Sequence, residues 1–220
     1  MFFIYQIFIS SIIIISPLII LIRLVNGKED KKRFKEKFSL TNRKPLKGKT
    51  IWFHAASVGE TMSIIPIVRY YKKKKEIKTI LITTTTLSSA RIVEKLKLSK
   101  VIHQFFPIDH FILVKKFLNH WRPKIAIFLE SEIWPCMFYQ LYKKNIPLIL
   151  LNARLTKKSF NRWMMLKNFA EKIFGLIKKS YPQNHQTKFF LKKLNVENFE
   201  QLGNLKFINN KVETKDISNK

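Results

Sequence analysis

Cysteine, glycine and acidic side chains are all scarce in this 220-residue chain. Its single cysteine, Cys136, excludes an internal disulfide, fits a reducing compartment and lies in no spacing typical of a metal site. The 14 acidic residues are outnumbered by 42 Lys and Arg, so the net charge of +28 points to an acidic partner: nucleic acid, anionic lipid or a phosphorylated substrate. A general preference for Lys, Ile, Asn and Phe over residues such as Gly (5 in all) accounts for part of this charge, because the lysines are spread along the chain.

Charged residues are also missing from the stretch between Phe2 and Ile22. At about 1.5 Å per residue, a helix of this length is roughly 32 Å long, which is enough to cross a hydrocarbon core of about 30 Å. A signal peptide is the alternative, but no basic region precedes the apolar run and no small-residue cleavage site follows it. We therefore expect residues 1–25 to be a membrane anchor.

A cluster of basic residues follows the apolar run. It comprises Arg23, Lys28, Lys31, Lys32, Arg33, Lys35 and Lys37, with Glu29, Asp30 and Glu36 as the acidic residues among them. Such a cluster beside an apolar segment is typical of the cytoplasmic side and can hold anionic lipid head groups. We expect the globular part to face the cytosol, whether the anchor spans the membrane or only embeds in it.

Short apolar runs alternate with helical patterns beyond a polar linker at Asn42 to Lys49. The predicted strands are Ile51–His54, Thr79–Thr83, Val101–Phe106, Ile125–Leu129 and Leu148–Leu151, and the predicted helices between them are Thr61–Lys74, Leu87–Leu98, Phe111–Trp121 and Trp134–Lys143. This alternation predicts an α/β fold, with a Rossmann-like parallel sheet and helices on both of its faces. The continuous apolar character of the strands agrees with a sheet covered on both sides.

The rest of the chain gives weaker patterns. A longer helical pattern covers Ser159 to Lys179, a short helix is expected near Gln186–Leu194, and a last turn or strand ends in Gly203 to Phe207. We divide the chain into a membrane anchor (1–25), a basic juxtamembrane segment and linker (26–49), a Rossmann-like domain (50–207) and a polar tail (208–220).

The segment His54 to Glu60 carries the most informative pattern, because it places small residues and one carboxylate at the end of a buried strand. Ligands of α/β domains bind at this end of the strands. Gly59 allows a helix to begin there, and Glu60 falls in its first turn. An acidic residue in a first turn also serves as a partner of the helix dipole, so Glu60 alone does not decide between a site and a cap.

Further polar residues follow the fourth and fifth predicted strands. Glu130 and Glu132 flank a serine, and Arg154 closes the next strand. Unpaired buried charge is costly, so these carboxylates face either a cleft or a cation such as Arg122 or Arg154. Arg154 in turn can grip a carboxylate or phosphate, or pair with one of the two glutamates. Burial would raise the pKa of a carboxylate here, whereas helix amides would lower it.

Two other polar turns are best explained as helix caps. Thr83 to Thr86 ends the second predicted strand, and capping explains its hydroxyls better than phosphate binding. Asp109 follows the third strand and is placed to cap the helix that begins near Phe111.

Five segments in order resemble the 3-deoxy-D-manno-octulosonic acid (Kdo) transferases of lipopolysaccharide assembly. They are His54 to Glu60, Trp121 to Pro123, Glu130 to Pro135, Asn152 to Leu155 and Gly203 to Phe207. The resemblance also covers the apolar segment and its basic trailer. Cys136 stands where the family usually has Asn, and Leu202 where Thr is common.

The resemblance implies the amino-terminal half of a glycosyltransferase B fold, in which two Rossmann-like halves enclose the active site. It implies inverting transfer of Kdo from CMP-Kdo to a lipid A precursor (lipid IVA) at the cytoplasmic face of the inner membrane, with no metal and no other cofactor. Glu60 is then the general base, and Glu130 and Lys206 stabilise charge during transfer. Ser57, Gly59, Glu132 and Arg154 are expected to bind substrate, and Arg154 with the basic surface suits the acceptor's phosphates.

Three functions remain to be weighed. The chain is expected to lack the donor-binding half, so the first is a Kdo transferase whose carboxyl-terminal half is encoded separately. The second is a catalytically inactive, membrane-anchored remnant that binds acidic glycolipid. The third, a nucleic-acid binder, is disfavoured because no stacking aromatics or basic stripes form a pattern. We therefore expect CMP-Kdo, lipid A precursor and anionic lipids of the inner membrane as partners, and no nucleic acid.

Overall fold

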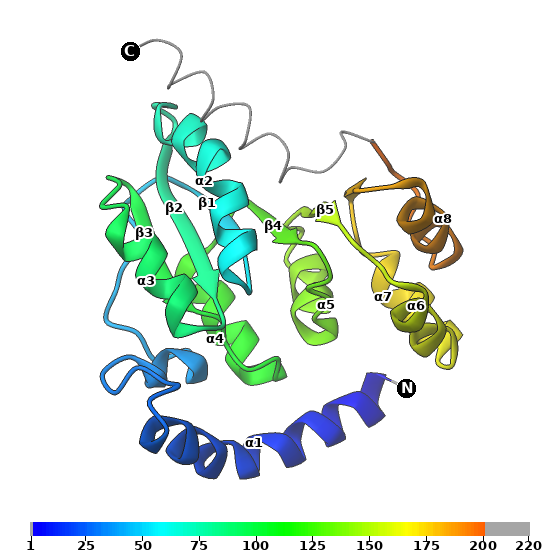
Figure 1. Cartoon of the computed structure of the whole chain (residues 1–220), viewed down its shortest axis with the longest axis horizontal. Coiled ribbons are helices and arrows are strands. Elements are labelled where there is room, and N and C mark those ends of the chain that lie inside the picture. The colour runs from blue at the N-terminus through cyan, green and yellow to red at the C-terminus, as the bar shows by residue number, and fades with distance from the viewer. Residues whose placement is uncertain (1, 201–220) are drawn as a thin grey trace.

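The computed structural model describes residues 2–200, which form a six-stranded parallel sheet in the order β3-β2-β1-β4-β5-β6. Its strands are β1 (Lys49–His54), β2 (Ile77–Thr84), β3 (Val101–Phe105), β4 (Ile125–Leu129), β5 (Leu148–Ala153) and β6 (Lys179–Pro182). The helices are α1 (Phe2–Val25), α2 (Val58–Lys72), α3 (Leu87–Lys95), α4 (Phe111–Trp121), α5 (Pro135–Lys143), α6 (Lys157–Met164), α7 (Lys167–Phe174) and α8 (His185–Lys193), with a 3-10 helix η1 (Phe34–Phe38) after α1 (Figure 1). This is the predicted Rossmann-like fold.

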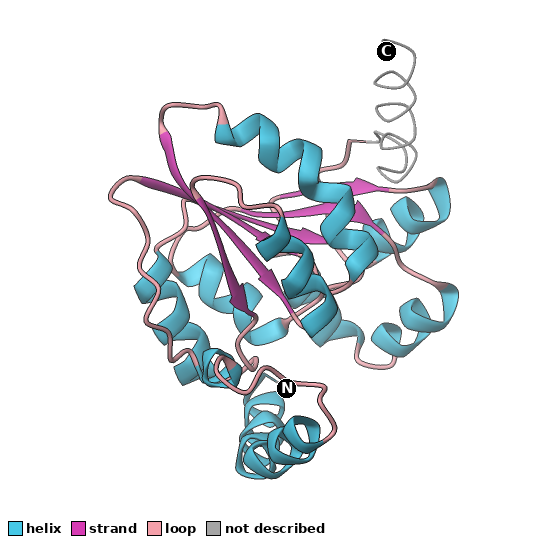
Figure 2. Ribbon diagram, turned by 60° about the vertical axis from the view of Figure 1, so that its left-hand side comes forward, coloured by secondary structure: helices cyan, strands magenta, loops and turns pink. Residues whose placement is uncertain are grey.

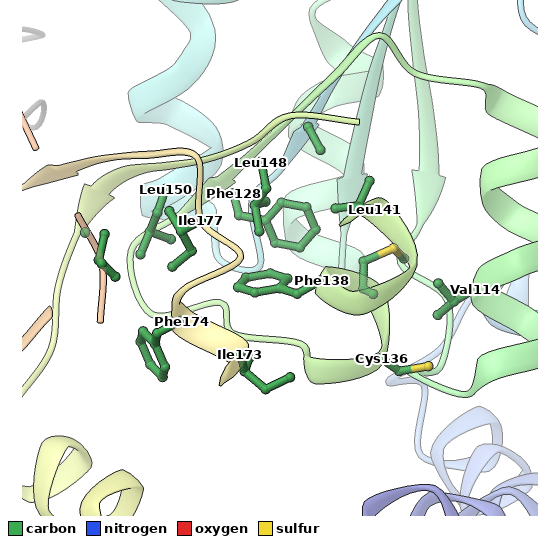
Figure 3. Packing of buried hydrophobic residues seen from close by; sticks show 14 of the residues in the cluster. Val114, Phe128, Cys136, Phe138, Leu141, Leu148, Leu150, Ile173, Phe174 and Ile177 are labelled. Atoms are coloured by element: carbon green, nitrogen blue, oxygen red, sulfur yellow. The ribbon is translucent and has the colours of Figure 1, made fainter. Parts of the chain in front are cut away.

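Helices cover both faces of the sheet (Figure 2), and a separate apolar cluster lies under each layer. Successive strand residues point to opposite faces, so Phe53 of β1 packs with α2 and α3 while its neighbour Trp52 packs with α4 and α5. The cluster around Trp52 is the larger one. Figure 3 shows part of it, including Phe138 of α5 beside Phe128 of β4. Burial on both faces explains why the strands read as continuous apolar runs.

The sequence-based strands coincide with β1 to β5 to within two residues at each end, and α2 to α5 and α8 also lie where helices were expected. The continuous helix expected from Ser159 to Lys179 is wrong. Its region contains α6, α7 and the edge strand β6, with a break at Leu166, whose φ of −120° and ψ of 44° are not helical. The spacing of apolar residues is similar in α6 and α7, so it gave no sign of the break, and β6 is too short to show alternation.

The expected helix caps are confirmed at one turn and wrong at another. Thr86 caps α3, since its hydroxyl oxygen accepts a hydrogen bond from the Ser89 amide at 3.2 Å. Asp109 does not cap α4, whose N-cap residue is His110. Asp109 instead accepts hydrogen bonds from the backbone amides of Cys136 and Met137, at 2.9 and 2.8 Å, in the first turn of α5. Tertiary packing has brought it to a different helix from the one next to it in sequence.

The apolar amino-terminal segment forms a single helix. Residues 4–25 of α1 are long and apolar enough to cross a membrane, with a mean hydropathy of 2.6. The basic segment that follows includes η1, which packs against β3 and was not expected from the sequence. The domain boundaries drawn above stay predictions. The segment Gly203 to Phe207, with Lys206, and the tail at 208–220 lie outside the described residues.

Candidate functional site

The candidate site lies where the strand order of the sheet reverses. β1 lies between β2 and β4, so the chain leaves β1 toward one side of the sheet and later returns to build the other side from β4. The loops after two such strands diverge at their carboxyl ends, and ligands of open α/β sheets bind in the crevice between them. Here those loops are residues 55–57 after β1 and residues 130–134 after β4, the two segments that carry the predicted carboxylates.

Glu60 lies in the first turn of α2, and the N-cap residue of this helix is Ser57. The Ser57 oxygen accepts a hydrogen bond from the Glu60 amide at 3.3 Å, and its hydroxyl donates to Glu60 Oε1 at 2.9 Å. The second carboxylate oxygen, Oε2, accepts from the Ala56 amide at 2.9 Å. Glu60 is buried, with 7% of its surface exposed, whereas Ser57 and Gly59 on the same turn are exposed. The carboxylate is therefore fixed in place near the carboxyl end of β1.

Burial raises the pKa of Glu60 to about 7. The hydrogen bonds from Ser57 and from the Ala56 amide act in the opposite direction, while the nearby charges of Glu132 and Glu130 add to the rise. Burial thus outweighs the amides at the helix start, a balance that the sequence left open. A carboxylate with this pKa is partly ionised at neutral pH and binds a proton strongly enough to act as a general base.

A hydrogen-bonded group of buried side chains holds Glu132. His54, the last residue of β1, is fully buried and its Nε2 lies 3.2 Å from Glu132 Oε2, to which Trp134 Nε1 also donates at 2.9 Å. His54 Nδ1 lies 3.0 Å from the Thr83 hydroxyl oxygen, which accepts a hydrogen bond from Trp52 Nε1 at 2.9 Å. Glu132 is therefore tied through His54 to the core of the sheet.

Glu130 and Arg154 are linked through their backbones. The Arg154 amide donates to the Glu130 carbonyl at 3.3 Å, and the Ser131 hydroxyl donates to the Arg154 carbonyl at 2.6 Å. Glu130 has a φ of 50°, a left-handed conformation that turns the chain sharply at the end of β4. Within residues 2–200, Glu132 contacts His54 and forms no ion pair with Arg122 or Arg154. The ion pair with one of these arginines, which the sequence left open, is therefore wrong for Glu132. The Arg154 side chain is exposed at the rim.

The structure thus brings Glu60 and Glu132 close enough to interact, with Glu130 nearby, and leaves Arg154 exposed at the same edge. The sequence analysis included His54 and Trp134 in its motifs but gave them no role. Their contacts with Glu132 depend on the pairing of β1 with β4, which no local pattern reveals. Within the described part of the chain, no group of three or more His, Cys, Asp and Glu side chains could hold a metal ion.

Comparison with known proteins identifies the family. The model of the 3-deoxy-D-manno-octulosonic-acid transferase (kdotransferase) family matches residues 32–209. The chain belongs to this Kdo transferase family. Its expected membership, drawn from five motifs, is confirmed.

Curated Kdo transferases are similar over most of this chain but extend well beyond it. The enzyme of Rickettsia bellii is 40% identical over 195 residues, which cover 88% of this chain and 46% of that protein. The probable mitochondrial enzyme of Arabidopsis thaliana is 39% identical over 164 residues, which cover 73% of this chain and 37% of that protein. The chain therefore spans about half, or less, of the length of these Kdo transferases.

The solved structures support the fold. The UDP-GlcNAc 2-epimerase of Neisseria meningitidis superposes with a TM-score of 0.57 at 11% identity, covering 77% of this chain and 50% of that one. At this identity the likeness concerns architecture alone. It agrees with a Kdo transferase domain built as one Rossmann-like unit.

The charge of Glu132 can be tested through its neighbour. Glu132→Gln is expected to lower the pKa of Glu60, because the Glu132 charge is one of the causes that raise it. The glutamine oxygen can still accept the hydrogen bonds from His54 and Trp134. Carbon-13 NMR titration of the glutamate carboxyls measures the shift, with Glu130→Gln as a matched control of smaller effect. A pKa of Glu60 that stays constant or rises in Glu132→Gln contradicts the proposed coupling.

Proposed function

We propose that this chain supplies the acceptor-binding, base-carrying half of a Kdo transferase, which moves Kdo from CMP-Kdo to a lipid A precursor in lipopolysaccharide synthesis. The observation that carries the proposal is Glu60, a buried carboxylate whose pKa is about 7, at the reversal point of a domain that belongs to this family. Transfer of a sugar to a hydroxyl with inversion needs one base on the face opposite the leaving group. Glu60, fixed by hydrogen bonds at the carboxyl end of β1, suits that task.

In this mechanism Glu60 accepts the proton of the acceptor hydroxyl while the acceptor oxygen forms a bond to the anomeric carbon of Kdo. The bond from that carbon to CMP breaks, and CMP departs with the bonding electron pair. Ser57 holds the Glu60 carboxylate in place through its hydroxyl. Exposed Gly59 leaves the backbone bare beside the carboxylate, so the acceptor can approach it closely.

Other residues are proposed to stabilise charge and bind substrate. Glu130 and Lys206 stabilise the charge that develops during transfer, Glu132 orders the acceptor side of the crevice, and Arg154 binds an acceptor phosphate. Arg154 is exposed at the rim, where a guanidinium can take a phosphate in a bidentate manner. The basic surface adds attraction for an acidic glycolipid at the inner membrane.

Donor binding is assigned to a second half. The matched region covers 46% of the Kdo transferase of Rickettsia bellii and 37% of that of Arabidopsis thaliana. The remainder of each protein is long enough for a second domain of similar size. Glycosyl transfer depends on holding both substrates in register, so a base without a bound donor accelerates little. We propose that a second half, of the kind that extends beyond the matched region in these relatives, completes the site.

The test is transfer of labelled Kdo from CMP-Kdo to lipid A precursor by the purified chain, with and without the carboxyl-terminal half of the Rickettsia bellii enzyme. Activity that requires the second half supports the proposal. Activity of the chain alone contradicts the assignment of donor binding to another half. Acceptor binding without transfer in either mixture contradicts the catalytic role and leaves a glycolipid-binding remnant.

A further inference from the structure

The amino-terminal end of α1, far from the linker that joins it to the domain, is hydrogen-bonded to that domain. The Tyr5 hydroxyl donates to Asp109 Oδ2 at 2.7 Å, and the Gln6 amide donates to Cys136 Sγ at 3.3 Å. One α-helical turn later, the Ser10 hydroxyl oxygen lies 3.4 Å from His110 Nε2. These polar residues of an otherwise apolar helix thus meet the turns that begin α4 and α5.

Asp109 is the centre of this contact. It is buried and accepts three hydrogen bonds, one from Tyr5 of α1 and two from the first backbone amides of α5. Burial raises the pKa of Asp109 to about 7, and the hydrogen bonds from Tyr5 and from the two amides at the start of α5 act in the opposite direction. The Tyr5 hydroxyl thus donates to a carboxylate that also accepts from the first amides of α5. We call Tyr5 and Asp109 the clasp.

The contact with the domain continues along the helix. Ser16 and Ile20 are buried, and Arg23, in the last turn, pairs at 2.6 Å with buried Glu29 of the basic juxtamembrane segment. Figure 1 shows α1 curving along one end of the domain over its whole length. The opposite face of α1 is exposed and apolar, and its large side chains are Ile4, Ile7, Phe8, Ile14, Ile15, Leu18, Ile19, Leu21, Ile22 and Val25.

This arrangement is incompatible with a helix that crosses the bilayer. Tyr5 and Arg23 lie roughly 27 Å apart along the helix, close to the full thickness of a hydrocarbon core of about 30 Å. If α1 spanned the membrane, Tyr5 would lie near the leaflet opposite the domain. Asp109 belongs to the domain that follows the basic segment, so it could not reach Tyr5 there.

We propose that α1 lies in the plane of the membrane, held to the domain by the clasp, with its exposed apolar face in one leaflet. The occupant of that face is an anionic lipid bilayer. The apolar face has the length and hydropathy of a membrane segment, and basic residues such as Lys28, Lys31 and Lys32 follow it immediately. The proposal is independent of the transfer chemistry.

An in-plane helix also sets the height of the site above the membrane. The starts of α4 and α5, which α1 contacts, lie at the carboxyl ends of the strands, the same edge of the sheet as Glu60 and Glu132. Trp134, which donates to Glu132, immediately precedes α5. The head-group layer would then lie beside the crevice, where a lipid-linked acceptor can reach the site without leaving the bilayer.

Spin labels on the exposed face test the orientation. Ile7→Cys, Ile14→Cys and Leu18→Cys, each in the full-length chain with Cys136→Ser, are labelled and bound to phosphatidylethanolamine vesicles that contain phosphatidylglycerol. Collision rates with oxygen and a water-soluble nickel complex report the depth of each label. An in-plane helix places all three at similar depth below the head groups. A depth that changes by roughly 16 Å from position 7 to position 18, or labels in water, overturns the proposal.

A cross-link tests the clasped position separately. Ser10→Cys with His110→Cys, in the Cys136→Ser chain, is expected to be joined by a short bifunctional thiol reagent in vesicle-bound protein, because the two side chains lie 3.4 Å apart and both are partly exposed. Ile14→Cys with His110→Cys, with residue 14 on the exposed face, is the matched control and should not be joined. Equal label depths without the cross-link between positions 10 and 110 would show a flat helix that is not docked, which overturns the clasp.

Discussion

Glu60→Gln is expected to reduce Kdo transfer by the completed enzyme by about 10²- to 10⁴-fold while leaving acceptor binding nearly unchanged. Glutamine keeps an oxygen to accept the hydrogen bond of the Ala56 amide and fits the same space, but it cannot take the proton of the acceptor hydroxyl. Single-turnover transfer rates and acceptor binding, measured on the same preparations, separate the two effects.

A matched variant and a pH profile sharpen this prediction. Ser57→Ala removes a neighbour of the carboxylate but not the base, so it should lose less activity than Glu60→Gln. Because the pKa of Glu60 is about 7, transfer by the native site should rise with pH through about 7, and the residual activity of Glu60→Gln should lack that rise. A Glu60→Gln variant that transfers Kdo at the native rate refutes the assignment.

The same shift predicts a pH dependence of stability. The pKa of Glu60 is raised from 4.5 to about 7, so the folded state binds this proton more tightly than the unfolded state does. Its contribution to the free energy of unfolding is fully present below about pH 4.5 and is lost as the pH rises through about 7. The Glu60→Gln variant should lack this contribution. The free energy of unfolding of the native chain, measured by denaturation, should therefore fall more than that of the variant as the pH rises through about 7.

Arg33→Met is expected to destabilise the fold by about 3–5 kcal/mol, the second large effect, because it removes the two short hydrogen bonds to the buried carboxylate of Glu36 and leaves only the longer contact with Arg43, at 4.0 Å. Arg33 Nε and one terminal nitrogen each donate to Glu36 at 2.9 Å, and the guanidinium also contacts Glu94 and lies over the Phe105 ring. Glu36 is buried and accepts from the Phe105 amide of β3 at 2.9 Å. Urea denaturation monitored by circular dichroism measures the loss.

The double variant Arg33→Met with Glu36→Met is the control. Removing both charges avoids the unpaired carboxylate, so the double variant should be more stable than Arg33→Met, although the Phe105 amide then loses its acceptor. If Arg33→Met is no less stable than the native chain, the ion pair between Arg33 and Glu36 does not stabilise the fold.

Sequence patterns sufficed where a structure depends on neighbours in the chain. The apolar runs of β1 to β5 and the helices between them were visible because burial on both faces of a sheet leaves a local signature. The cap of α3 at Thr86 is local as well. In contrast, Asp109 reaches α5, His54 reaches Glu132, and Arg33 in the basic segment reaches His103 of β3.

The features that sequence analysis missed share a physical cause. Each depends on which side chains meet across strands or helices, and a charge in a basic run looks the same whether it is solvated or buried. The contact of Tyr5 and Gln6 with the domain is another example, because hydropathy measures how apolar a helix is and says nothing of where its few polar residues point. The break between α6 and α7 was missed for a different reason, since two short amphipathic helices share one spacing.

The central position of β1 has a consequence for the order of folding. β1 pairs with β2, the next strand in the chain, but also with β4, so that Phe53 lies opposite Ile127. Pairings between residues so distant in sequence form slowly, because the intervening chain must first be ordered. During synthesis, β1 to β3 can emerge and associate before β4 leaves the ribosome. The contact between His54 and Glu132 therefore forms late. The time at which the His54 ring becomes protected from chemical modification would report when β4 has joined the sheet.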